Sequence, residues 1–194
     1  KAGLEIDDAD VALNKGDNYF CIQHSQLFLS STYEGQSTAL RFRDVGLEKP
    51  ASGRSMTIKS ALIIFTVSEH NPDVAEGAGF IVRGLFDSSP WLENAICEQK
   101  HPPAGDNYVS RVRTASSVAY TPNDWAITEK HTVDVTAIVQ EIVNSPDWTG
   151  DSMAFAIDKL TTSTSNLKAY SNEGGILLRD LSRQPQFVVT FSTQ

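Results

Sequence analysis

The sequence has no apolar run that could cross a lipid bilayer as a helix, which takes about 20 consecutive apolar residues. The longest apolar run, residues 61–65, has the length of a strand. Residues 1–8 also lack the apolar core of a secretory signal peptide. We therefore expect no transmembrane segment, and one explanation for the missing leader is that the numbering starts at a mature N-terminus.

Positive charge is scarce as well, because 16 Lys and Arg residues stand against 24 Asp and Glu residues in a chain of 194 residues. The resulting net charge of −8 argues against nucleic acid, whose phosphates require a basic surface. It also argues against attraction to anionic membranes by charge alone. Divalent cations or neutral ligands match such a chain better.

Motifs of common enzyme classes are missing: there is no Gly-x-Ser-x-Gly elbow and no glycine-rich phosphate loop. The histidines form no metal-binding spacing and are interpreted as surface or capping residues. They are His24, His70, His101 and His131. A triad assembled in space and a pair of glycosidase carboxylates stay open. We expect a protein that is not an enzyme.

Cysteine is limited to Cys21 and Cys97. In a secreted domain such a pair would form one disulfide, whereas an intracellular protein would keep two buried thiols. The two residues alone do not decide between these alternatives.

What the sequence does contain is a series of short apolar or alternating segments separated by turns. Alternation in segments such as 38–43 and 153–157 predicts half-buried strands, and 56–67, apolar on both faces, predicts a central strand. The other segments are 18–22, 26–29, 79–83, 116–120, 175–178 and 186–191. This pattern predicts an all-β fold, a jelly-roll-like antiparallel β-sandwich, with residues 1–194 forming a single domain.

One segment, residues 134–144, has the spacing of a short amphipathic helix. Its apolar residues fall on one face and are Val135, Ile138, Val139 and Ile142. Asp134 is the predicted N-cap, and Pro146 ends the helix. A helix this short is not stable alone in water, so we expect it to lie on a sheet.

The order of these segments resembles a family of secreted β-sandwich modules found in marine and environmental bacteria and in some marine eukaryotes. The family is similar to the disaggregatase-related and alginate-associated carbohydrate-binding modules. The matching segments are 6–10, 25–29, 38–45, 58–65, 113–120 with Trp125, 134–144 with Trp148 and Gly150, and Pro185. The chain departs from the family at 92–110, at Tyr120 and at 168–174, which are loops or loop edges that could contact ligand.

The resemblance implies a secreted, extracellular protein that binds polysaccharide. It favours a disulfide between Cys21 and Cys97, which would contribute roughly 4 kcal/mol in the chain-entropy model. It also supports a Ca²⁺ site at the acidic cluster Asp7, Asp8 and Asp10, since Ca²⁺ needs several oxygen ligands. A solvated acidic terminus is the alternative for this cluster.

Aromatic residues in or beside predicted loops are the candidates for stacking on a sugar, and they are Trp91, Tyr108, Trp125 and Tyr170. Packing under loops is the alternative for each of them, and Trp148 is expected to pack at the end of the helix. Four arginines could meet an anionic sugar, although their alternation suggests solvent-facing positions. They are Arg41, Arg43, Arg111 and Arg113.

These observations lead to three functional expectations. The first is a non-catalytic carbohydrate-binding protein whose ligand is a glycan, assisted by Ca²⁺. The second is a carrier of a small apolar ligand, such as a lipid or pigment, held between the sheets or at the interface of an oligomer. The third is a polysaccharide-active enzyme.

Overall fold

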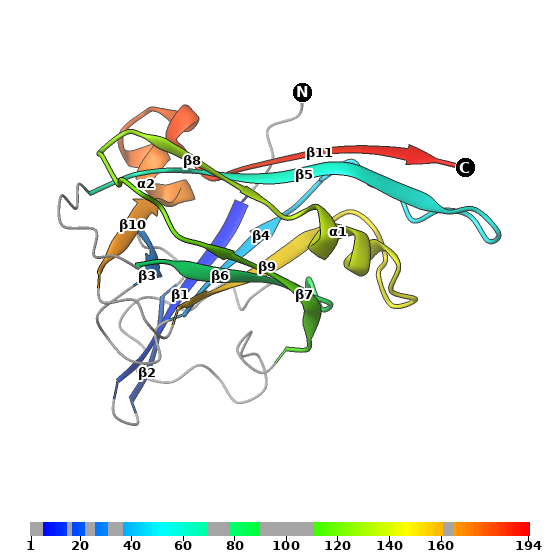
Figure 1. Cartoon of the computed structure of the whole chain (residues 1–194), viewed down its shortest axis with the longest axis horizontal. Helices are drawn as coiled ribbons and strands as arrows, with labels where there is room; N and C mark the ends of the chain where they lie inside the picture. Colours follow the sequence, from blue (N-terminus) through cyan, green and yellow to red (C-terminus); the bar gives the residue numbers. More distant parts are fainter. Residues whose placement is uncertain are drawn as a thin grey trace.

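Two antiparallel layers face each other across an apolar core in the computed structural model of the chain (Figure 1). The structure describes residues 26–30, 37–69, 78–89, 111–160 and 165–194, together with the backbone of 6–14 and 17–21. The prediction of an all-β antiparallel sandwich is confirmed. Among the described residues no helix combines the length and the apolar character needed to cross a membrane.

One layer is a six-stranded sheet in the order β2-β1-β4-β9-β6-β7. These strands are β1 (Ile6–Asn14), β2 (Asp17–Cys21), β4 (Ser37–Phe42), β6 (Phe80–Leu85), β7 (Arg113–Tyr120) and β9 (Met153–Lys159). The other layer holds a three-stranded sheet, β11-β5-β8, and a two-stranded sheet, β10-β3. Its strands are β3 (Gln26–Ser30), β5 (Met56–Thr66), β8 (Lys130–Asp134), β10 (Leu167–Tyr170) and β11 (Gln186–Thr193).

Side-chain alternation decides which face of each strand enters the core. Met153, Phe155 and Ile157 of β9 have no exposed surface, and Phe155 and Ile157 pair in register with Leu40 and Thr38 of β4. Rings from both layers meet there: the Phe155 ring lies 5.7 Å from the ring of Phe187 on β11, measured between centroids. The inward face of β9 is therefore the one that its alternating sequence predicts.

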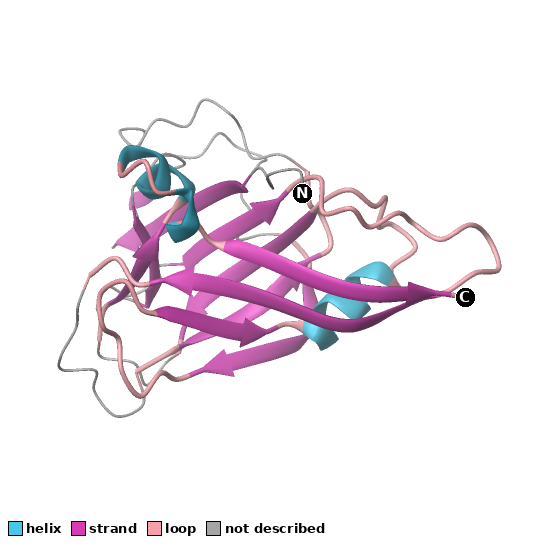
Figure 2. Cartoon of the chain, turned by 90° about the horizontal axis from the view of Figure 1, so that it is seen from above, coloured by secondary structure: helices cyan, strands magenta, loops and turns pink. Residues whose placement is uncertain are grey.

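The predicted helix exists as α1 (Thr136–Val143), and it lies on the sandwich end opposite α2 (Asn172–Leu177) (Figures 1 and 2). Strand β8 leads directly into α1. The residue between them, Val135, still bonds to the sheet, since its amide donates to the Ala61 carbonyl of β5 at 2.8 Å. The N-cap is therefore Val135, and the prediction of Asp134 is wrong by one residue. Asp134 instead accepts from the Thr136 amide at 2.9 Å.

Polar side chains of α1 bind the helix to β5, along the part of that strand that β8 does not pair with. The Ile58 amide donates to Gln140 Oε1 at 2.8 Å, and Gln140 Nε2 donates to the Met56 carbonyl at 3.1 Å. The Ala61 amide donates to Thr136 Oγ1 at 2.9 Å. With Ile138 and Ile142 fully buried beneath it, α1 has one fixed position on the sandwich.

Strands β1, β8 and β10 and helix α2 were not predicted as the structure has them. Strand β1 contains three aspartates, which hide its β-alternation, and it is recognisable only by its pairing with β2 and β4. Helix α2 covers part of the apolar segment 175–178 and contains two glycines, which disfavour a helix. It is held by contacts with distant residues, such as the bond from Gln184 Nε2 to Asn172 Oδ1 at 2.6 Å.

Candidate functional site

The outer face of the six-stranded sheet carries small residues in its middle and charged residues around them. In register, Ser37 lies opposite Asp158 and Ala39 opposite Ala156 on neighbouring β4 and β9. Arg83 of β6 lies opposite Ala156 on the other side of β9. The strand alternation that buries one face in the core thus collects polar groups on the other.

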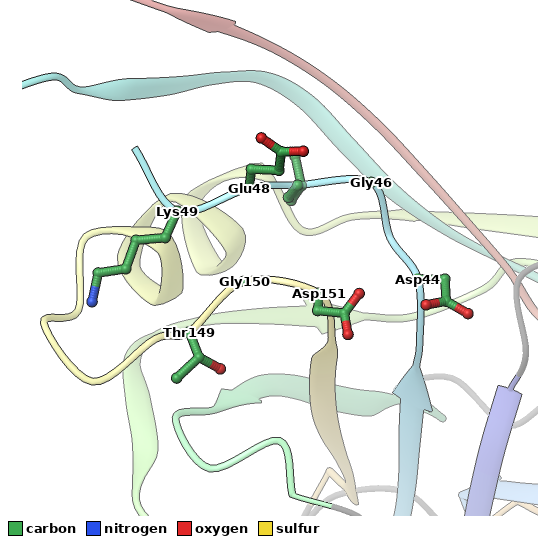
Figure 3. A pocket seen from close by; sticks show the side chains of 8 residues that line it. Asp44, Gly46, Glu48, Lys49, Thr149, Gly150 and Asp151 are labelled. Carbon is green, nitrogen blue, oxygen red and sulfur yellow. The ribbon is translucent and has the colours of Figure 1, made fainter. Parts of the chain in front are cut away.

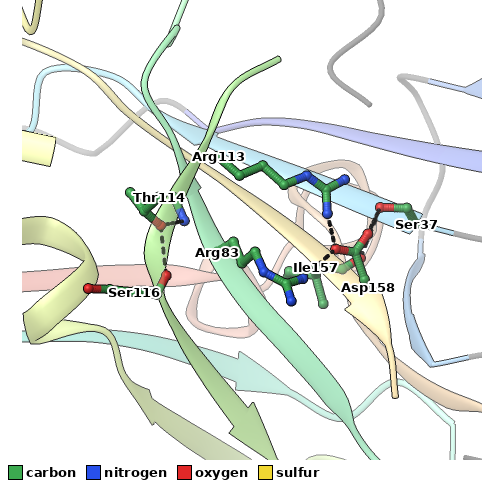
Figure 4. A network of polar contacts seen from close by, with 8 residues as sticks. Ser37, Arg83, Arg113, Thr114, Ser116, Ile157 and Asp158 are labelled. Atoms are coloured by element: carbon green, nitrogen blue, oxygen red, sulfur yellow. Dashed lines mark hydrogen bonds and ion pairs between the residues drawn. The ribbon is translucent and has the colours of Figure 1, made fainter. Parts of the chain in front are cut away.

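Beside these small residues two arginines share one carboxylate (Figure 4). Nη1 of Arg83 lies 3.3 Å from Asp158 Oδ2, and Nη1 of Arg113 contacts the same oxygen. Ser37 Oγ donates to the other oxygen, Oδ1, at 2.7 Å. The side chains of Arg83, Arg113 and Asp158 keep 32%, 25% and 23% of their surface exposed. We call Arg83, Arg113 and Asp158 the arginine pair site.

The arginine pair site has donors to spare. A guanidinium group has five N–H donors and no acceptor. Within the described residues Arg83 and Arg113 each donate one hydrogen bond, to Asp158. Two positive charges on one negative charge leave a local excess of +1, so this partly exposed site can take a further anionic group.

An irregularity in β7 sets the position of Arg113. The register of β6 and β7 shifts between Arg83 and Leu85, so that Leu85 pairs with Arg113. The buried Thr114 hydroxyl bridges the irregularity, accepting from the Gly84 amide at 2.9 Å and donating to the Ser116 carbonyl at 2.8 Å. Bulges of this kind redirect a strand's side chains.

Glu141 of α1 completes the irregular part of β7 from outside. Its carboxylate accepts from the amides of Ala115 at 2.7 Å and Ser116 at 2.8 Å. Burial acts to raise the pKa of Glu141, but these hydrogen bonds outweigh it and bring the pKa below its ordinary value. The helix predicted from sequence therefore helps to position Arg113.

Two of the four predicted arginines are structural. Arg41 is only 7% exposed, and its Nε donates to the Ser88 carbonyl at 2.6 Å. The Arg111 side chain is also 7% exposed, and its Nη1 donates to the carbonyls of Asp87 at 3.0 Å and Ser89 at 2.8 Å. The prediction that they face solvent is wrong, because both hold the 87–89 segment against the sheet.

An open hollow of about 520 Å³ lies between two loops at the start of β9 (Figure 3). Its loops are joined by bonds from the Val45 amide to the Asp151 carbonyl and from the Asp151 amide to the Leu47 carbonyl, both 3.1 Å. The side chains of Asp44 and Asp151 both line this hollow. Across the described residues, however, no three His, Cys, Asp or Glu side chains gather closely enough to hold a metal ion.

The predicted Ca²⁺ ligands lie on β1, where the backbone alone is described. Asp7, Asp8 and Asp10 pair in register with Arg41, Leu40 and Thr38 of β4. Their side chains lie outside the described residues, so the Ca²⁺ site stays a prediction. The disulfide has the same status, because Cys21 ends β2 and Cys97 lies outside the described residues.

The aromatic candidates divide into three groups. Trp91 and Tyr108 lie outside the described residues. Trp125 has no exposed surface and its Nε1 donates to the Lys168 carbonyl at 3.1 Å, so the packing alternative describes it and the ligand-binding prediction is corrected. Tyr170 is half-buried, with the Arg183 guanidinium 5.3 Å from its ring centroid. Trp148 is buried, as predicted.

One histidine proves to be a core residue and not a surface or capping residue. His131 is 8% exposed and stacks on Trp125 with 4.4 Å between ring centroids. Its Nδ1 lies 2.8 Å from the Tyr120 hydroxyl, and its Nε2 lies 3.4 Å from Glu129 Oε2. Burial lowers the pKa of His131 below 6.5, although Glu129 opposes this change. His24, His70 and His101 lie outside the described residues.

Comparison of the chain with models of protein families and with curated proteins finds no match. The resemblance to carbohydrate-binding modules therefore stays a prediction.

Two members of the arginine pair site, Arg83 and Asp158, were missed by the sequence analysis. Both were within reach of it: Arg83 ends the predicted strand 79–83, and Asp158 directly follows the predicted strand 153–157. What the sequence could not supply was the register that places them on one face.

Proposed function

We propose that this chain is a non-catalytic glycan-binding protein, and that Arg83 and Arg113 hold an acidic group of the glycan. The observation that carries the proposal is that two partly exposed guanidinium groups share the single carboxylate of Asp158. The planar guanidinium fork matches the oxygens of a carboxylate or sulfate group, which it can bind through two parallel hydrogen bonds.

The position of the arginine pair site also supports the proposal. Arg83 and Arg113 extend from adjacent strands of a sheet, and strands hold side chains more firmly than loops do. An acidic group of a glycan that reaches the exposed parts of the Arg83 and Arg113 side chains could meet both arginines at once. Hydroxyl groups nearby, such as Ser37 Oγ on Asp158, keep the carboxylate in place.

The acidic chain as a whole works against an acidic ligand, so the proposal needs the local charge to dominate. At physiological ionic strength charges are screened beyond about 8 Å. The net charge of −8 then acts weakly, while Arg83 and Arg113 act at contact distance. Binding should therefore weaken as salt increases, since the contacts are ionic.

The family resemblance adds further features to the proposed function. It includes an extracellular location, a disulfide between Cys21 and Cys97, and Ca²⁺ at Asp7, Asp8 and Asp10. Trp91 and Tyr108 would add stacking contacts for the sugar rings. The described hollow is lined by polar and charged side chains such as Asp44 and Asp151, which does not favour the alternative of an apolar ligand.

The proposal is tested with three immobilised polysaccharides: a polyuronate, a sulfated galactan and a neutral glucan. We expect the protein to bind at least one acidic polysaccharide and to ignore the neutral one, with affinity that falls as NaCl is raised. A parallel series in EDTA tests the Ca²⁺ site separately. Equal binding to the neutral polysaccharide, or no binding to either acidic one, would contradict the proposal.

A further inference from the structure

An apolar surface lies on α2 and on the short 3-10 helix, Leu181–Arg183, that follows it. Among the described residues, six of the eight exposed large hydrophobic side chains fall between residues 176 and 191. We call the first four the α2 surface: Ile176, Leu177, Leu178 and Leu181, which are 54%, 73%, 50% and 62% exposed. Scattered exposed leucines are ordinary, but a cluster of them marks an interaction site.

Polar contacts hold the α2 surface in one shape. Ser171 Oγ accepts from the Gly174 amide at 3.0 Å and caps α2. The Asp180 carboxylate accepts from Ser182 Oγ at 2.6 Å and from Arg183 Nε at 2.8 Å. Because polar side chains fix this turn, its leucines are free to project outward, and little conformational entropy is lost when a partner covers them.

The charges around the α2 surface indicate which partner fits. Residues 172–194 hold two acids, Glu173 and Asp180, and two bases, Arg179 and Arg183, so this segment is neutral while the whole chain carries −8. Two copies of the chain repel each other, and that repulsion is smallest where the surface is neutral. A strongly basic partner would find no matching charge there.

The same charges are self-complementary. Arg179 is exposed and makes no ion pair within the described part of the chain, and the next residue is the oppositely charged Asp180. A two-fold axis beside them would set Arg179 of each copy against Asp180 of the other, as a symmetric interface requires.

Strand β11, which follows the α2 surface, is also suited to a second copy. It is an edge strand of the sheet β11-β5-β8, and Gln186–Thr193 contains no charged residue and no proline. Natural proteins usually protect exposed edges with such residues. Val188 and Phe191 on β11 are 47% and 39% exposed, which extends the apolar character of this region.

We propose that the α2 surface is the interface through which two copies of this chain form a symmetric dimer. The test is sedimentation of the full chain over a wide range of concentration. We expect the wild type to show twice the mass of one chain, and Leu177→Ser/Leu181→Ser to show the mass of one chain with an unchanged circular dichroism spectrum. Arg179→Glu should weaken the dimer several-fold.

The matched control is Val112→Ser/Ile127→Ser, which removes two apolar side chains that are 70% and 52% exposed elsewhere on the molecule. This variant should remain a dimer. The proposal is overturned if the wild type sediments as one chain at every concentration, if the Leu177→Ser/Leu181→Ser variant stays dimeric, or if the control dissociates equally. Binding of a monomeric wild type to phosphatidylcholine vesicles would assign the surface to lipid and also overturn it.

Discussion

At the scale of single residues, His131 links stability to pH. Its buried imidazole faces Tyr120, Trp125 and Glu129, and burial keeps its pKa below the ordinary value of 6.5. In the unfolded chain the ordinary pKa applies, so as pH falls below about 6.5 the unfolded state takes up a proton that the folded state resists. The contribution of neutral His131 to stability is therefore present above this pH and is lost below it.

We expect the free energy of unfolding, measured with urea between pH 7.5 and pH 5, to fall with pH more steeply in the wild type than in His131→Gln. Other histidines contribute to both proteins and cancel in the difference. A variant with the same slope as the wild type would show that His131 is not the group responsible.

The backbone conformation of Thr128 predicts how a second substitution changes stability. It has φ of +67°, a left-handed conformation that is strained for a β-branched residue, and its amide donates to the Val67 carbonyl at 3.0 Å. The left-handed penalty is about 1–2 kcal/mol, and glycine loses about 0.5–1 kcal/mol more entropy on folding. Thr128→Gly should therefore raise the free energy of unfolding by about 0.5–1 kcal/mol.

The control for this variant is Thr132→Gly on β8, an exposed threonine in regular strand conformation. There glycine brings only its entropic cost, so stability should fall by about 0.5–1 kcal/mol. Thermal unfolding that changes in the same direction for both variants would refute the assignment of strain to Thr128.

At the scale of elements, α1 depends on a glycine in β6. A Cβ at Gly84 would lie 2.7 Å from Ile142 Cδ1, 2.8 Å from Ile138 Cγ2 and 2.9 Å from Thr114 Cγ2. Gly84→Ala should therefore displace α1 and cost about 1–3 kcal/mol of stability, as overpacked cores do. The milder Ile142→Val, expected to cost about 0.5–1.5 kcal/mol, removes a methylene without a clash.

Because Glu141 and Thr114 link α1 to the irregular part of β7, Gly84→Ala should also disturb Arg113. We expect weaker binding to an acidic polysaccharide in Gly84→Ala and unchanged binding in Ile142→Val. Loss of stability without any change in affinity would show that α1 does not position Arg113.

The elements also show what could be predicted from the sequence. Regular apolar spacing was enough for α1 and for β9, whose buried Met153, Phe155 and Ile157 alternate with smaller residues or Asp158. Strand β1 and helix α2 could not be predicted from apolar spacing. Aspartates obscure the pattern of β1, glycines obscure that of α2, and partners distant in sequence hold both elements in place. The arginine pair site depends on pairing across β9, β6 and β7, and single-strand patterns do not contain that register.

At the scale of the whole molecule, the two faces of the six-stranded sheet carry different kinds of side chain. One face supplies Leu40, Phe42 and Phe155 to the core, and the other carries Arg83, Arg113 and Asp158. With the α2 surface at one end of the sandwich, a dimer would carry two arginine pair sites. Two sites on one polymeric ligand raise the apparent affinity when both can be occupied together.

The most direct test of this account is the affinity of the full chain for an acidic polysaccharide, measured by titration calorimetry for the wild type, Arg83→Ala/Arg113→Ala and Arg54→Ala. Arg54 is an exposed arginine remote in sequence from the site, and Arg54→Ala is the control for the loss of a positive charge elsewhere on the chain. We expect the double variant to lose at least about tenfold in affinity, equivalent to about 1.4 kcal/mol, and Arg54→Ala to bind as the wild type does. Wild-type affinity in the double variant, with Arg54→Ala also unchanged, would contradict the central claim that Arg83 and Arg113 hold the ligand.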